Sequence, residues 1–122
     1  MATIAEPELT FTRLPHPAPA SGEMRAEILA NPGFGTNFTD HMISIDWTEG
    51  LGWHDATIGP RGPIALDPAA AVLHYAQEIF EGLKAYVQAD GGIALFRPEA
   101  NAKRFNASAE RLAMPTLPES LF

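Results

Sequence analysis

The sequence contains no cysteine, which excludes both a disulfide framework and catalysis by a thiol. Basic residues are also few: eight lysines and arginines stand against fifteen aspartates and glutamates, for a formal net charge of −7. Such an acidic chain would repel the phosphates of a nucleic acid, so we expect no nucleic-acid partner. No apolar run approaches the roughly 20 residues that span a bilayer, and no apolar core of a signal peptide follows Met1. We therefore expect a cytoplasmic protein that does not bind membranes.

The residues that often mark metal or hydrolytic sites do not form the patterns that such sites need. The four histidines are not spaced as metal ligands, and no carboxylate pattern completes a set with them. They are His16, His41, His54 and His74. Asp40-His41 and His54-Asp55 each supply two members of a catalytic triad, but neighbouring side chains rarely face each other, and no nucleophile-elbow motif accompanies them. We expect no metal site and no hydrolase.

At 122 residues, the chain is long enough for one small domain with a single core. Apolar and polar residues alternate over His41–Trp47, which predicts a half-buried strand. Gly50-Leu51-Gly52 interrupts the pattern, and Trp53–Ile58 and Ile64–Leu66 are predicted as further, shorter strands. We therefore expect a small sheet in the first half of the chain.

The first 30 residues differ from the rest in composition. Three prolines lie between Leu14 and Gly22, which favours an extended, polyproline-like segment. We predict that residues 1–30 form a flexible tail, with docking to an aromatic groove of a partner as the alternative. Residues Glu23–Ala30 favour a short helix within this tail, which Asn31-Pro32-Gly33 would end.

The strongest helix signal begins at Asp67. Asp67 is a good N-cap and Pro68 suits a first helical turn, so we predict a helix from there to Gly82. Gly82 fits the position after a helix because glycine adopts left-handed geometry without strain. The apolar face of this helix would carry Val72, Ala76, Ile79 and Phe80. The face in water would carry His74, Gln77, Glu78 and Glu81.

A hairpin and a second main helix are predicted next. Residues Leu83–Gln88 alternate, Asp90-Gly91 is typical of a tight turn, and Ile93–Phe96 is the returning strand. Pro98 suits the first turn of a helix that runs to about Met114 and ends before the next proline. Its expected core stripe is Phe105, Ala109, Leu112 and Ala113. A polar stripe carries Asn101, Arg104, Ser108 and Arg111. An antiparallel sheet packed against two main helices is an α+β fold.

Three motifs in the chain resemble one enzyme family. They are FGTNFTDHM at positions 34–42, LHYAQEIFEGLKAY at 73–86 and NAKRF at 101–105. In this order they resemble the branched-chain amino-acid aminotransferases, which use pyridoxal phosphate (PLP) and share the fold type of the D-amino-acid aminotransferases. The likeness implies that residues 31–122 form the small N-terminal domain of such an enzyme. The large domain, which carries the Schiff-base lysine of the family, would then lie outside this chain.

The resemblance implies a role for four residues. Arg104 stands where the family contacts the phosphate of PLP, and a guanidinium can hold two oxygens of such an anion in a planar fork. Phe34, Tyr75 and Phe80 stand where the family lines the pocket for the substrate side chain, with Phe38 the less favoured substitute for Phe34. Plain core packing is the alternative for these aromatics. If the missing domain covers them, Phe34, Tyr75 and part of Phe80 should be exposed in this chain alone.

The implied activity is transfer of the amino group of leucine, isoleucine or valine to 2-oxoglutarate by a homodimer. The chain alone would be inactive, because it contains no catalytic residue of the family. A D-amino-acid aminotransferase or a PLP-dependent lyase of the same fold type is the second hypothesis, and the FGT and FEGLK patterns favour the branched-chain group over it. A non-catalytic binding or assembly domain is the third.

Overall fold

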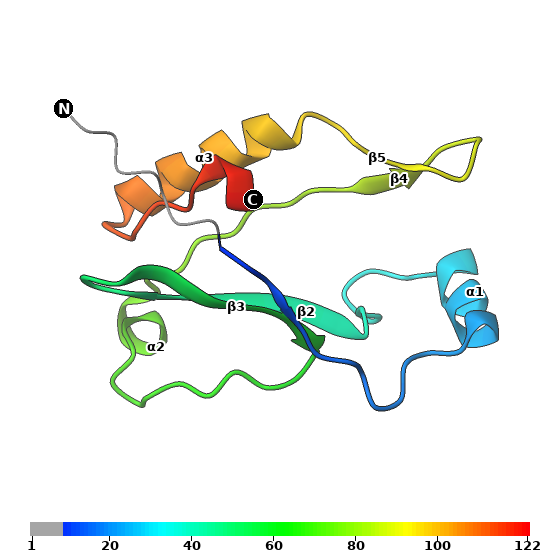
Figure 1. Ribbon diagram of the computed structural model, residues 1–122, viewed down its shortest axis with the longest axis horizontal. Helices are drawn as coiled ribbons and strands as arrows, with labels where there is room; N and C mark the ends of the chain where they lie inside the picture. The colour runs from blue at the N-terminus through cyan, green and yellow to red at the C-terminus, as the bar shows by residue number, and fades with distance from the viewer. Residues whose placement is uncertain (1–8) are drawn as a thin grey trace. The chain divides into compact units, whose positions relative to one another are not determined.

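The computed structural model describes residues 9–122, and it divides into two compact units. The first unit ends at Ile64 and the second is Ala65–Phe122. Each unit has its own small sheet, and the strands of both sheets are mostly antiparallel (Figure 1). The α+β fold class is therefore confirmed. Residues 1–8 of the predicted flexible tail lie outside the described residues, and the domain boundary at residue 31 stays a prediction.

The first unit is built on the long hairpin of β2 (His41–Thr48) and β3 (Gly52–Pro60). The two strands pair antiparallel, with Met42 opposite Gly59 and Trp47 opposite Trp53. Both predicted strands are confirmed, and β3 is longer than expected. The register shifts by one residue opposite Ser44–Asp46. The extra residue forms a β-bulge in β3 next to Asp55, which has a positive φ of 51°.

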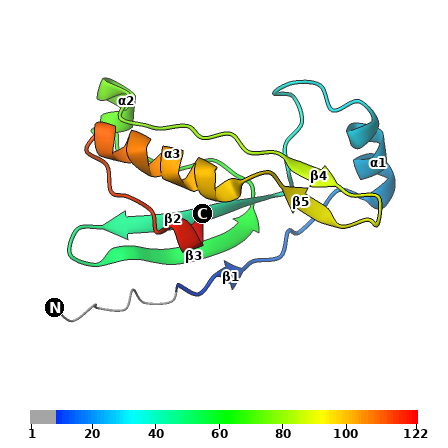
Figure 2. The same cartoon turned by 90° about the horizontal axis from the view of Figure 1, so that it is seen from above.

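Two short elements accompany this hairpin. The strand β1 (Thr12–Arg13) pairs parallel with β3, so the strand order is β1-β3-β2 (Figure 2). The strand β1 is an addition to the strands expected from the sequence. The helix α1 (Gly22–Ala30) confirms the short helix expected here. Ser21 caps it, because its Oγ accepts a hydrogen bond from the Met24 N–H at 3.1 Å.

The second unit contains α2 (Ala71–Tyr75), β4 (Ala85–Val87), β5 (Ile93–Leu95), α3 (Pro98–Arg111) and the 3-10 helix η1 (Glu119–Leu121). The strands β4 and β5 form the predicted antiparallel hairpin. Asp90 Oδ1 accepts the N–H of Gly92 at 2.9 Å, and Gly91 has a φ of 83°. The Asp-Gly turn is thus confirmed, and glycine is needed there because of its positive φ.

The predicted helix from Asp67 to Gly82 is wrong in its extent. The helix α2 covers only residues 71–75, and Ala76 leaves it in the left-handed conformation with φ 50°. Asp67 makes a turn before the helix, where its Oδ1 accepts the N–H of Ala69 at 2.8 Å. The strand expected at Ile64–Leu66 is also absent from this described stretch. The helix ends early because side chains and backbone of residues 77–82 bond to residues 101–112 instead.

The helix α3 begins at Pro98 as predicted and ends three residues before the expected Met114. Ala113 has a φ of 53°. Its N–H bonds to the carbonyl of Glu110 at 3.1 Å, and the N–H of Met114 bonds to that of Ala109 at 2.9 Å. These two bonds form a Schellman motif, which satisfies the last carbonyls and ends the helix.

Only small side chains are fully buried among the described residues. They are Ala56, Ala102 and Ala109. Of the predicted core stripe of α3, Ala109 is buried and Phe105 is half-buried against the ring of Phe122, with 5.7 Å between ring centroids. Leu112 and Ala113 are exposed, so that part of the prediction is wrong. Among residues 9–122, no helix is both long and apolar enough to cross a membrane.

Candidate functional site

The segment 76–84, which follows α2, is attached to α3 by side-chain hydrogen bonds. Gln77 Nε2 donates to the carbonyl of Leu112 at 2.9 Å, beyond the C-terminal end of α3. Asn101 Nδ2 donates to the carbonyl of Gly82 at 2.9 Å, near the N-terminal end of the helix. These bonds align the segment with α3 and require a non-helical backbone. They therefore account for the end of α2 at Tyr75.

Glu81 is the centre of this attachment. Its side chain is only 5% exposed and accepts four hydrogen bonds. Arg104 Nε donates to Oε2 at 2.7 Å, and Arg104 Nη2 donates to Oε1. Asn101 Nδ2 and the N–H of Gly82 also donate to Oε1, at 2.9 and 3.0 Å. The prediction that Glu81 lies in water is wrong, because the backbone turns its side chain toward α3.

The electrostatics of the pair follow from these contacts. The guanidinium of Arg104, followed by the amide of Asn101, lowers the pKa of Glu81 to about 2. The carboxylate in turn raises the pKa of Arg104. Both partners are therefore charged over the whole range in which proteins normally work.

Arg104 is held by Glu81 on one side and is open on the other. Its side chain is 69% exposed. A guanidinium has five N–H groups, of which one on Nε and one on Nη2 bond to the carboxylate. Three N–H groups, two of them on Nη1, thus remain for an external acceptor. An exposed, always charged group with several free donors can bind an anion such as a phosphate.

The three predicted substrate-binding aromatics are exposed, as expected from the sequence. Phe34 is 100% exposed, Tyr75 is 86% exposed and Phe80 is 89% exposed. Core packing of Phe80 on an apolar helix face is excluded, because the residue lies in the non-helical segment 76–84. Its ring lies against Gly82, where a Cβ atom would come within 3.7 Å of it. The roles of these aromatics in substrate binding stay predictions.

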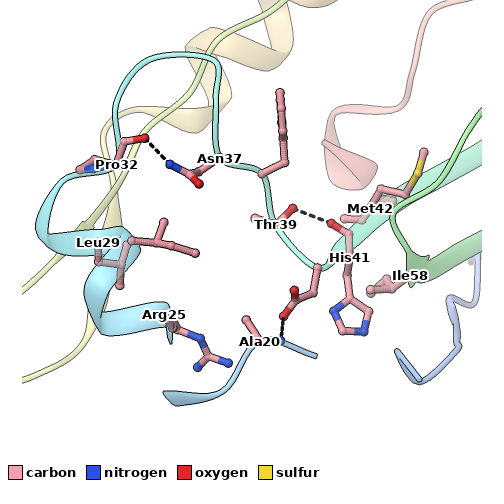
Figure 3. A pocket seen from close by; sticks show the side chains of 13 residues that line it. Ala20, Arg25, Leu29, Pro32, Asn37, Thr39, His41, Met42 and Ile58 are labelled. Atoms are coloured by element: carbon pink, nitrogen blue, oxygen red, sulfur yellow. Dashed lines mark hydrogen bonds between the residues drawn. The ribbon is translucent and has the colours of Figure 1, made fainter. Parts of the chain in front are cut away.

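A mostly apolar pocket of about 620 Å³ lies in the first unit (Figure 3). It is formed by α1, the loop that follows it and the start of β2, and Asp40 closes one side by accepting the N–H of Ala20 at 3.0 Å. Phe38 lines this pocket, and the guanidinium of Arg61 lies 4.2 Å from the centre of its ring. Phe34 does not line it. Phe38 therefore lines this pocket and contacts Arg61, and the preference for Phe34 over Phe38 in substrate binding stays a prediction.

One pair of neighbouring side chains does face each other, contrary to expectation. His54 Nδ1 lies 2.8 Å from Asp55 Oδ2, and its Nε2 lies 2.9 Å from the hydroxyl of Thr48. The positive φ of Asp55 at the bulge turns the carboxylate back toward the imidazole. Asp55 is 79% exposed, so we assign the array to the structure of the hairpin rather than to catalysis. Among residues 9–122, no three potential ligands gather into a metal site.

The lowered pKa of Glu81 predicts a pH dependence of stability. A carboxyl group whose folded-state pKa lies near 2, below its usual 4.5, stabilises the fold above pH 4.5. This contribution should disappear as the pH falls from 4.5 toward 2. Glu81→Gln should lose stability at pH 6 and show a shallower decline on acidification than the unmodified protein. Urea unfolding midpoints at pH 6 and pH 3 would check this, and equal declines in both proteins would contradict it.

No family model matches the chain. Curated proteins do match it along most of its length. It is 62% identical over 113 residues to a probable branched-chain-amino-acid aminotransferase of Streptomyces coelicolor. The matched stretch makes up 93% of this chain and 31% of that protein. It is 61% identical over 114 residues to the branched-chain-amino-acid aminotransferase of Mycolicibacterium smegmatis, with the same coverage. The chain therefore spans about a third of the length of the relatives that it matches.

Proposed function

The chain belongs to the branched-chain-amino-acid aminotransferase family, and from this premise we propose that it forms the small N-terminal domain of such an enzyme. The complete enzyme would transfer the amino group of leucine, isoleucine or valine to 2-oxoglutarate. Because the relatives are about three times longer, the residues that complete the active site would come from the remaining length. A homodimer located in the cytoplasm is part of the proposal.

The observation that carries the proposal is the state of Arg104. The residue is 69% exposed, is held by a nearly buried carboxylate, and has donors left for an anion. These features fit the phosphate of PLP, so Arg104 would hold that group from this domain. When bound, PLP supplies the electron sink that transamination requires. The role of this chain would be to bind PLP and to orient it.

The exposed aromatics support the substrate half of the proposal. Tyr75 directly precedes the segment 76–84, and Phe80 lies within it next to Glu81, which bonds to Arg104. This part of the chain would therefore present apolar surface to the substrate and a partner to the arginine. A branched aliphatic side chain is bound mainly by burial, at about 0.8 kcal/mol for each CH₂ removed from water. The hydroxyl of Tyr75 would offer a polar contact to the carboxylate side chain of the alternative substrate glutamate.

The exposed apolar surface argues against the third hypothesis, a domain that acts alone. On the hairpin of β4 and β5, Val87 is 79% exposed, Ile93 is 75% exposed and the adjoining Phe96 is 74% exposed. Such surface normally lies against other protein. We propose that the rest of the enzyme or its second subunit covers it. Comparing turnover of L-leucine and D-alanine by the complete enzyme would separate the branched-chain activity from that of the D-amino-acid aminotransferases.

Tyr75→Ala in the complete enzyme tests the proposal. We expect kcat/KM for leucine and isoleucine to fall at least about tenfold, the scale of one apolar side-chain contact. The thermal midpoint should change little, because Tyr75 is 86% exposed and contributes little to the fold of this domain. Steady-state kinetics and a thermal melt of the same preparations supply both numbers.

The matched control is Tyr86→Ala, which removes the only other tyrosine of the chain, from β4. We expect this control to keep the preference among amino acids. A large loss of thermal stability in Tyr75→Ala, with the substrate preference intact, would instead make Tyr75 a packing residue and remove it from the substrate pocket.

A further inference from the structure

Glu81 differs from its neighbours in a way that substrate binding does not explain. Along residues 77–81 the side chains alternate between half-buried and exposed positions. Phe80 points outward and is 89% exposed, whereas the side chain of Glu81 points inward and is 5% exposed. A nearly buried carboxylate with four donors is costly to desolvate and stays only where its partners hold it firmly. Its position calls for a specific role.

We propose that Glu81 is a positioning residue, which fixes the guanidinium of Arg104 so that its remaining donors face the phosphate of PLP. This inference rests on the proposed function. The carboxylate is itself fixed by Asn101 and by the N–H of Gly82. It then engages Nε and Nη2 of Arg104 together, which sets both the direction and the plane of the guanidinium. An arginine that is 69% exposed would otherwise occupy many rotamers.

Two effects of Glu81 on phosphate affinity oppose each other. Its negative charge lies near the anion and reduces the attraction of the arginine for it. That repulsion is screened by water and salt, because the guanidinium is largely exposed. The orienting effect is not screened, since it removes the entropy cost of ordering a long side chain on binding. Orientation should therefore dominate, and loss of Glu81 should weaken phosphate binding.

The test measures the affinity of the complete apoenzyme for PLP and for pyridoxal, which lacks the phosphate. Glu81→Gln should weaken PLP binding about tenfold, the scale of ordering one arginine side chain. It should leave the affinity for pyridoxal unchanged, because Glu81 acts only through the phosphate contact. Glu78→Gln is the matched control: it removes the same charge from an exposed position of the same segment and should change neither affinity.

Combining the change with Arg104→Ala isolates the mechanism. If Glu81 acts through Arg104, Glu81→Gln should cause no further loss of PLP affinity once Arg104 is alanine. An equal loss of PLP and pyridoxal affinity in Glu81→Gln would show a general structural role and overturn the inference. Unchanged or tighter PLP binding would overturn it as well.

The failure of this inference and that of the proposed function can be told apart. If Arg104→Ala leaves PLP affinity unchanged, the proposed phosphate contact is wrong. If Arg104→Ala weakens PLP binding and Glu81→Gln does not, only the positioning role is wrong. Should Glu81→Gln fail to fold, Asn101→Ala removes one restraint from the same carboxylate. It should then give a smaller loss of affinity that is again confined to PLP, and an equal loss for pyridoxal would overturn the inference.

Discussion

Replacing Arg104 by alanine in the complete enzyme is expected to weaken the binding of PLP by about 2–3 kcal/mol, the scale of a charge-assisted contact. That free energy corresponds to a loss of affinity of roughly 30- to 150-fold. The physical reason is that the exposed guanidinium would offer a fixed charge and several N–H donors to the phosphate. Titration of the apoenzyme with PLP, followed by absorbance, measures the effect.

Replacing Arg104 by alanine is also expected to lower the stability of the fold, and this effect must be distinguished from the loss of PLP affinity. Removing Arg104 leaves the nearly buried carboxylate of Glu81 without its main partner, which destabilises the fold. Arg104→Lys is the matched control, since it keeps the charge but cannot form the two-pronged contact with Glu81. We expect the PLP affinity of Arg104→Lys to lie between that of the unmodified enzyme and that of Arg104→Ala. An alanine variant that folds and binds PLP normally would remove Arg104 from the phosphate site.

In the second half of the chain, the features that depend only on neighbouring residues were predicted correctly from the sequence. Asp90-Gly91 encodes its turn through backbone conformation and one side-chain bond. Pro98 begins α3 because a first helical turn needs no N–H at that position. Neither feature depends on distant residues. The exposed state of Phe34 and Tyr75 also followed from the sequence, through the expectation that further protein covers them.

The early end of α2 could not be predicted in this way. The apolar residues between Val72 and Phe80 fit a helical period, but Gln77 and Glu81 bond to residues 35 and 23 positions away, on or just beyond α3. These long-range bonds favour an extended backbone over the local preference for a helix. The same helical pattern led to the wrong prediction that Glu81 lies in water. The sequence carries no alternating signal for an extended segment here, because Ile79 and Phe80 are both apolar and their neighbours Glu78 and Glu81 are both charged.

The residues 1–122 on their own are expected to show no aminotransferase activity and to form no specific covalent bond with PLP. Transamination needs a lysine that holds the cofactor and moves a proton at the substrate Cα. The chain has two lysines, and both are exposed. Lys103 is next to Arg104 on α3, about 100° round the helix axis, so it points away from the proposed phosphate site. Lys84 precedes β4, beyond the hydrogen bonds that attach the segment to α3.

Borohydride reduction of the chain in the presence of PLP would test this expectation, with circular dichroism to show that the preparation is folded. Mass spectrometry of the digested protein should find only weak, scattered labelling of Lys84, Lys103 and the N-terminus. The complete enzyme is the control, and it should carry one label per subunit at a lysine outside residues 1–122. Stoichiometric labelling of Lys84 or Lys103, together with turnover of leucine, would contradict the proposal. Such a result would place the catalytic amine on the same segment or helix that holds Glu81 and Arg104.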